Sequence, residues 1–108
     1  MQKTILSALA AAALGLSGAV LSSQPALATG AITCKSGPQS SWKSQKALAD
    51  KLVKEGWTIK KTKIDGGCYE VYGTTPDGDR VEAYFHPVTL EKLYVARRGQ
   101  VLFRAKGY

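Results

Sequence analysis

The apolar and polar positions after residue 41 follow a helical period first and a strand period afterwards. Over residues 42–55, apolar side chains recur at helical spacing and lysines occupy the opposite side, which is typical of an amphipathic helix. Ser40 or Ser41 can cap the first turn, and Gly56 can supply the left-handed conformation that ends a helix. The pattern therefore predicts a helix over residues 42–55.

From Trp57 onward the alternation shortens to every second residue, which is the period of half-buried β-strands. Clusters of glycine, aspartate and proline separate the alternating segments and favour tight turns. The segments predicted as strands are residues 57–64, 68–74, 80–86, 92–97 and a short one at 101–104. Because short turns join these segments, consecutive strands should pair antiparallel. The prediction is an α+β fold, with one N-terminal helix packed on a four- to five-stranded antiparallel β-meander.

The first 28 residues have the character of a signal peptide. Lys3 precedes an uncharged stretch, residues 4–21, that is rich in alanine and leucine. Ala26-Leu27-Ala28 then matches the pattern of small residues at which a signal peptidase cuts. We expect cleavage after Ala28, export to the periplasm or the extracellular space, and no stable membrane insertion afterwards. A retained anchor is the alternative, although glycine and serine dilute the apolar stretch.

Two cysteines are the only candidates for a covalent staple. Residues 29–40 carry glycine and proline without periodicity, so we expect an extended lead-in before a domain over residues 41–108. Cys34 lies in this lead-in and Cys68 begins the second predicted strand. An exported pair of cysteines favours a disulfide, and a small domain benefits from one. Two distant thiols and one histidine supply too few ligands for zinc, so we expect a Cys34–Cys68 disulfide and neither a metal nor a cofactor.

The charge of the chain favours anionic partners, and its chemistry favours binding over catalysis. Against 8 Asp and Glu stand 15 Lys and Arg, which gives a formal net charge of +7. Export argues against nucleic acid as the partner. His86, the single histidine, has no nucleophile motif around it. Glu70 and Glu82 lie on neighbouring predicted strands and could act as an acid pair, but a cross-strand charge network is the simpler interpretation. We expect no enzymatic activity.

One face of the predicted sheet is the best candidate for a binding surface. A single helix cannot cover both faces, and Tyr72 and Tyr84 are predicted on the face opposite it. With Lys61, Arg80 and Arg97 they would form an exposed aromatic and basic strip, and such side chains are common anchors of interfaces. The alternative is that a loop or the C-terminal tail covers the two tyrosines.

Several motifs of the chain resemble a PepSY domain of the small exported, cysteine-containing kind. They are Gly56-Trp57, Gly67-Cys68-Tyr69-Glu70-Val71-Tyr72, Asp77-Gly78-Asp79-Arg80-Val81-Glu82-Ala83-Tyr84-Phe85 and Pro87-Val88-Thr89. The resemblance covers about residues 42–95 and implies a helix on an antiparallel sheet, as the periodicity does. Family members usually have Asp before this Pro and Gly after this Thr, where the chain has His86 and Leu90. We therefore expect an altered turn after Pro87.

The resemblance also suggests two functions. PepSY domains occur in the propeptides of thermolysin-like metallopeptidases and in membrane-associated proteins, and they are proposed to restrain proteases. The first hypothesis is an exported, non-enzymatic binding module that restrains or chaperones a peptidase or another envelope protein. The alternative is a small basic envelope protein that binds an anionic surface component or a small ligand, without a protease partner.

Overall fold

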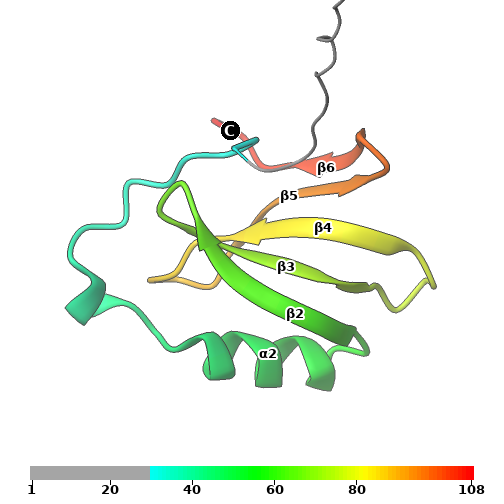
Figure 1. The fold of residues 1–108 in the computed structure, drawn as a ribbon, viewed down its shortest axis with the longest axis horizontal. Helices are drawn as coiled ribbons and strands as arrows, with labels where there is room; N and C mark the ends of the chain where they lie inside the picture. Colours follow the sequence, from blue (N-terminus) through cyan, green and yellow to red (C-terminus); the bar gives the residue numbers. More distant parts are fainter. Residues whose placement is uncertain (1–29) are drawn as a thin grey trace, which may run out of the picture.

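A five-stranded antiparallel sheet with one α-helix against one of its faces makes up the fold (Figure 1). The computed structural model describes residues 30–108, and the predicted signal peptide lies outside them. In chain order the elements are the 3-10 turn η3 (Gln39–Ser41), α2 (Gln45–Lys54), β2 (Thr58–Asp65), β3 (Cys68–Thr74), β4 (Arg80–Phe85), β5 (Lys92–Arg97) and β6 (Gln100–Arg104). Each strand pairs with the next one along the chain. The predicted α+β meander is confirmed with five strands, and in the described part of the chain the α-helix precedes all of them.

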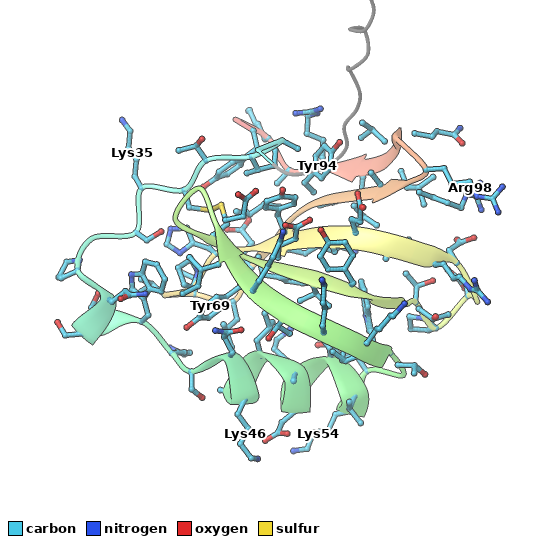
Figure 2. All side chains as sticks on the ribbon, in the orientation of Figure 1. Lys35, Lys46, Lys54, Tyr69, Tyr94 and Arg98 are labelled. Atoms are coloured by element: carbon cyan, nitrogen blue, oxygen red, sulfur yellow. A yellow bond between two sulfur atoms is a disulfide. The ribbon has the colours of Figure 1, made fainter. Side chains whose placement is uncertain are left out.

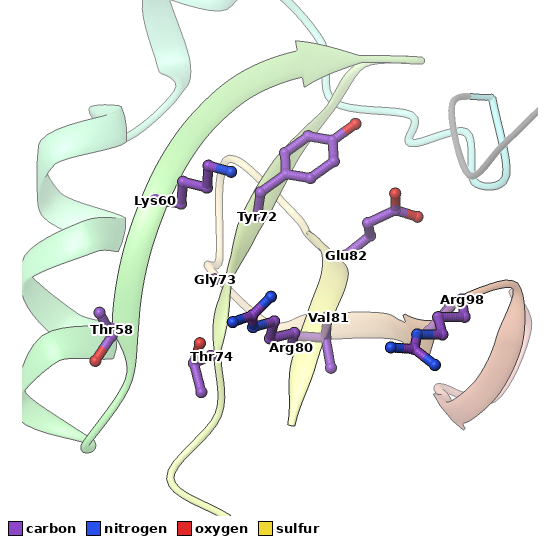
Figure 3. Close-up of a pocket in the computed structure, with 10 residues that line it drawn as sticks. Thr58, Lys60, Tyr72, Gly73, Thr74, Arg80, Val81, Glu82 and Arg98 are labelled. Atoms are coloured by element: carbon purple, nitrogen blue, oxygen red, sulfur yellow. The ribbon is translucent and has the colours of Figure 1, made fainter. Parts of the chain in front are cut away.

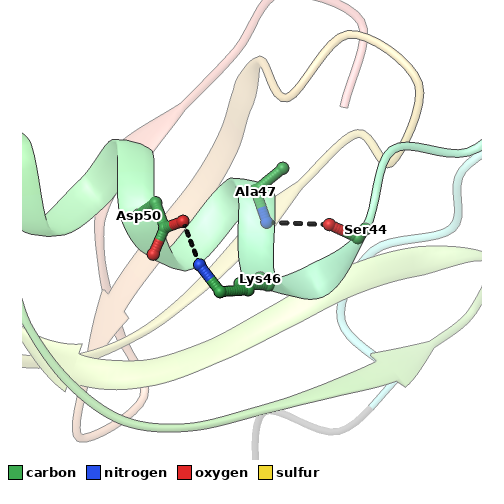
Figure 4. A network of polar contacts seen from close by, with 4 residues as sticks. All are labelled: Ser44, Lys46, Ala47 and Asp50. Carbon is green, nitrogen blue, oxygen red and sulfur yellow. Dashed lines mark hydrogen bonds and ion pairs between the residues drawn. The ribbon is translucent and has the colours of Figure 1, made fainter.

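The α-helix begins later than the sequence pattern predicted. Ser44, and not one of the two earlier serines, caps it by accepting a hydrogen bond from the Ala47 N–H at 2.9 Å (Figure 4). Trp42 stays extended, and its indole Nε1 donates to the Ser36 carbonyl at 3.1 Å. Its ring packs edge-on against Tyr69 at a centroid distance of 5.7 Å, so Trp42 makes a tertiary contact and does not belong to a helical face. The predicted helix stop is correct, since Gly56 follows the cap residue with a φ of 100°.

The sheet face under α2 holds the larger hydrophobic core. Leu48 and Leu52 of the helix are fully buried against it, as their spacing predicted. Trp57, which follows the helix, packs edge-on against Phe85 with ring centroids 5.9 Å apart. The other buried residues of this core are Tyr69, Val71, Val81, Ala83, Leu90 and Val95. The two-residue alternation therefore assigned the helix side of β3 and β4 correctly.

The turn after β4 holds an unusual conformation at Leu90, one of the two positions where the chain departs from the PepSY pattern. Strand β4 ends at Phe85, one residue before the predicted end. The His86 N–H donates instead to the Glu91 carbonyl at 2.9 Å, and the His86 carbonyl accepts from the Leu90 N–H at 2.7 Å. Leu90 has a φ of 65°, which is strained for a residue other than glycine. Its side chain is buried in the helix-side core, so burial offsets that strain.

Residues 30–36 of the lead-in lie against part of the opposite face and are fixed there by a disulfide. Cys34 is bonded to Cys68 at the start of β3, as predicted, and the Cys34 N–H donates to the Gly66 carbonyl at 2.8 Å. A Cβ at Gly66 would lie 2.6 Å from the Ile32 carbonyl oxygen, so only glycine permits this approach. The second core, under the lead-in, consists of Ile32, Cys34, Cys68, Tyr84, Leu93, Tyr94 and Ala96.

Loss of the disulfide should destabilise the protein, because the unfolded chain would no longer be restricted by a loop with a sequence separation of 34 residues. We expect a Cys34→Ala/Cys68→Ala variant to have a free energy of unfolding about 3 kcal/mol below that of the oxidised wild type. Urea unfolding with and without reductant measures it. Reductant should lower the midpoint of the wild type and leave that of the double variant unchanged. Equal midpoints for the oxidised and reduced wild type would show that the bridge adds nothing to stability.

Candidate functional site

Tyr84 is buried, which corrects its predicted place in an exposed strip. Its side chain is 0% exposed and packs with the lead-in residues Ile32 and Cys34. The Tyr94 ring meets it edge-on at a centroid distance of 5.8 Å. The lead-in covers Tyr84. The alternative considered for the sequence, that a loop covers the two tyrosines, is therefore correct for this residue. This residue offers no surface to a partner.

Asp65 joins the end of β2 to both Tyr84 and the lead-in. Its Oδ2 accepts a hydrogen bond from the Tyr84 hydroxyl at 2.7 Å and another from the Gly30 N–H at 2.7 Å. The Tyr84 hydroxyl and, next, the Gly30 N–H lower the pKa of Asp65, so it is ionised at neutral pH. Burial and then the bond to Asp65 raise the pKa of Tyr84, which keeps the hydroxyl protonated as donor. These hydrogen bonds hold the start of the lead-in against the sheet.

A shallow groove of about 570 Å³ lies on the part of this face that the lead-in leaves open (Figure 3). Strands β2, β3, β4 and β5 and the turn after β5 contribute to it. Its charged and aromatic members are Lys60, Arg80, Arg98, Glu82 and Tyr72. Three cations against one carboxylate give the groove a positive balance, and an open cleft of one sign attracts ligands of the other.

Tyr72, unlike Tyr84, stays half-exposed, and cations surround its ring. The Nζ atoms of Lys61 and Lys63 lie 5.0 Å and 5.6 Å from the ring centroid, within cation–π range. The strand register sets Tyr72 between Lys61 on β2 and Glu82 on β4. Of the predicted strip, the structure thus brings Tyr72, Lys61 and Arg80 to one open area. Their role as a contact surface stays a prediction.

Arg97 lies outside the groove, and two cations that line it were missed from the sequence. The Arg97 guanidinium is paired with Asp79 at 2.6 Å, which holds it at the turn before β4. Lys60 lines the groove because a β-bulge at this point of β2 shifts the register, which no alternation pattern predicts. Arg98 lines it from the turn after β5, where its φ is 52°. The sequence shows two neighbouring basic residues at this turn, but it does not show which of them reaches the groove.

Glu70 is buried at the boundary between the covered and the open parts of the face. Its side chain is 0% exposed, and its Oε1 lies 3.7 Å from the Lys63 ammonium. Burial raises the pKa of Glu70, and the Tyr72 hydroxyl and Lys63 oppose that rise without cancelling it. The strand register pairs Glu70 with Tyr84 and Glu82 with Tyr72, so each carboxylate lies opposite a tyrosine. The charge network with Lys63 agrees with the simpler interpretation of the sequence.

His86 has a structural position in the turn after β4. Its Nδ1 accepts a hydrogen bond from the Val88 N–H at 3.1 Å, and its Nε2 lies 3.4 Å from the Lys35 carbonyl oxygen. Residues 30–108 contain no cluster of three or more His, Cys, Asp or Glu side chains that could hold a metal ion. Within the same residues, no helix has the length and apolarity needed to cross a bilayer.

The fold and the groove define a class of protein: a small α+β module with one helix on an antiparallel meander and a basic surface groove. The chain matches the family described as peptidase propeptide and YPEB domain over residues 5–94, and it belongs to this family. PepSY domains are propeptide-like or inhibitory modules related to peptidases and are generally not catalytic. Neither the curated proteins nor the solved structures gave a match. The resemblance drawn from the motifs is thus confirmed.

Replacing Glu70 by Gln should change how stability depends on pH. A carboxyl whose folded-state pKa is raised above its ordinary value of 4.5 binds more protons in the folded chain, so its ionisation costs stability as the pH rises from that value. The lowered pKa of Asp65 acts in a separate window, below its ordinary value of 3.8. We therefore expect the stability of the Glu70→Gln variant, relative to wild type, to increase with pH above about 4.5.

Urea unfolding of both proteins between about pH 4 and pH 8 measures this difference, with Glu82→Gln as a control of equal charge. A difference between Glu70→Gln and wild type that stays flat over this range would contradict the raised pKa.

Proposed function

We propose that the chain is an exported, non-enzymatic binding module whose basic groove docks on an acidic surface of another exported protein, such as a peptidase, and restrains it. Membership of a family of peptidase propeptide domains supports the kind of partner. The signal-like sequence of residues 1–28 supports export. The observation that carries the proposal is the open groove itself, which Lys60, Arg80 and Arg98 line together with Tyr72.

The composition of the groove fits docking by a protein surface. Tyrosine and arginine are the residue types that dominate binding energy at interfaces, because they combine contact area with directed polar groups. Tyr72 and Arg80 stand on adjacent strands of a hydrogen-bonded sheet. A sheet loses little conformational freedom on binding, so rigid placement of these anchors lowers the entropic cost of association.

The same groove is poorly equipped for catalysis. Among the described residues that line it, Glu82 is the one carboxylate and the remaining polar side chains are threonines, a tyrosine and cations. General acid–base chemistry needs an orienting partner and a nucleophile within reach of the base. His86 serves the turn after β4 and does not line the groove. This distribution favours a surface that binds over one that transforms a substrate.

The alternative is a small anionic ligand or an anionic component of the cell envelope, bound by the same three cations. The two functions predict different losses of affinity when the Tyr72 ring is removed. A polyanion binds by charge and weakens steeply with salt, whereas a protein partner also buries the tyrosine ring. Loss of affinity in Tyr72→Ala at constant charge therefore separates a protein partner from charge attraction alone.

Removing the groove cations should weaken binding to an exported protein that the wild type recovers by pull-down. We expect the triple variant Lys60→Gln/Arg80→Gln/Arg98→Gln to lose about 1–3 kcal/mol of binding free energy. The control Lys46→Gln/Lys51→Gln/Lys54→Gln removes the same charge from α2, and Figure 2 shows Lys46 and Lys54 directed away from the sheet. Isothermal titration calorimetry at fixed salt compares the three proteins.

The control should retain wild-type affinity. An equal loss in both triple variants would assign the attraction to net charge and not to the groove. An unchanged affinity in the groove variant would contradict the assignment of the groove as the docking site.

A further inference from the structure

The two edges of the sheet differ in a way that points to a second binding element, separate from the groove. One edge is β2, and the other is β6 (Figure 1). Strand β2 carries Lys60, Lys61 and Lys63 and a β-bulge, which are common devices against pairing with another chain. Strand β6 has no charge at its three central positions. Its outer edge pairs with no other strand of residues 30–108.

The central residues of β6 expose apolar surface to solvent. Val101, Leu102 and Phe103 are 42%, 40% and 39% exposed. Three large apolar side chains in a row on an unpaired edge form a template onto which an extended segment can add as a further strand. None of the three lines the groove. They also follow residue 94, where the match to the family ends.

The surroundings of β6 select the charge of that segment. Residues 92–108 carry five cations and no Asp or Glu: Lys92, Arg97, Arg98, Arg104 and Lys106. The Arg104 guanidinium lies 5.0 Å from the Tyr94 ring centroid, and Lys92 Nζ lies 4.5 Å from that of Phe103. These contacts hold Arg104 on β6 and Lys92 on the neighbouring strand β5 against aromatic rings, whereas Arg97 is paired with Asp79. Pairing with a second copy of β6 would bring like charges together, so self-association is disfavoured.

The strand register also predicts how the segment would be patterned. Phe103 pairs with Val95, which faces the helix-side core, whereas Arg104 pairs with Tyr94 on the lead-in side. An added strand places successive side chains on alternate faces. Apolar side chains would therefore lie beside Phe103, and carboxylates would lie on the side of Arg104.

We propose that β6 binds an extended, acidic segment of a partner polypeptide, in which apolar residues alternate with Asp or Glu, as a sixth strand of the sheet. Main-chain hydrogen bonds to the outer edge of β6 supply the affinity, and the cations near the edge select the charge. This site goes beyond the proposed function of the groove and does not depend on it.

A synthetic peptide of seven residues with alternating Glu and Val tests the proposal on the purified protein. Two matched peptides serve as controls. One is N-methylated at every second residue, which keeps the charge but removes the donors along one edge, and the other replaces Glu by Lys. Titration followed by NMR gives the Kd, and amide hydrogen exchange locates the bound strand. We expect protection of β6 amides and at least about tenfold weaker binding of both control peptides.

Matched variants of the protein check the location independently. Phe103→Thr should weaken binding of the Glu/Val peptide several-fold, whereas Val53→Thr, at a 58% exposed apolar residue of α2, should not. Several outcomes would overturn the proposal. They are no binding of the Glu/Val peptide, equal affinity of its N-methylated form, protection at the groove in place of β6, and a dimer through β6 in analytical ultracentrifugation.

Discussion

The Cys34–Cys68 disulfide holds the lead-in against the sheet face that α2 leaves uncovered, and the layout of that face follows from it. A sheet with a single helix has one face without cover, and a small domain has few side chains to spare for it. Here an extended segment takes the place of a second layer. It buries Tyr84 beneath Ile32 and Cys34 and leaves the area around Tyr72 open. Two tyrosines on one face thus differ in exposure.

Among the described residues, cations outnumber carboxylates in the groove. Asp65 and Glu70 are both engaged within the fold, one with Tyr84 and the other buried near Lys63. Of the described residues that line the groove, Glu82 is the one carboxylate. We therefore propose that the cations of the groove interact with a partner.

Local patterns predicted most of the fold, and long-range contacts decided the rest. The predicted ends of β3 and β5 are correct, because the turn-forming residues that flank these segments mark where the strands stop. The helix start was predicted too early because Trp42 packs its ring against Tyr69 from an extended segment and not from a helical face. Tyr84 was misplaced for a related reason: alternation tells which face a side chain lies on, but not whether a distant segment covers that face. The groove position of Lys60 depends on a β-bulge and was equally hidden.

The central claim, that the disulfide divides one sheet face into a covered and an open part, can be tested by chemical modification of tyrosine. Nitration of the native oxidised protein, followed by peptide mass spectrometry, compares Tyr72 with Tyr84. We expect Tyr72 to react and Tyr84 to be protected, and we expect reduction of the disulfide under conditions that keep the helix folded to make Tyr84 reactive. Equal reactivity of both tyrosines in the oxidised protein, or protection of Tyr84 that persists unchanged after reduction, would contradict this claim.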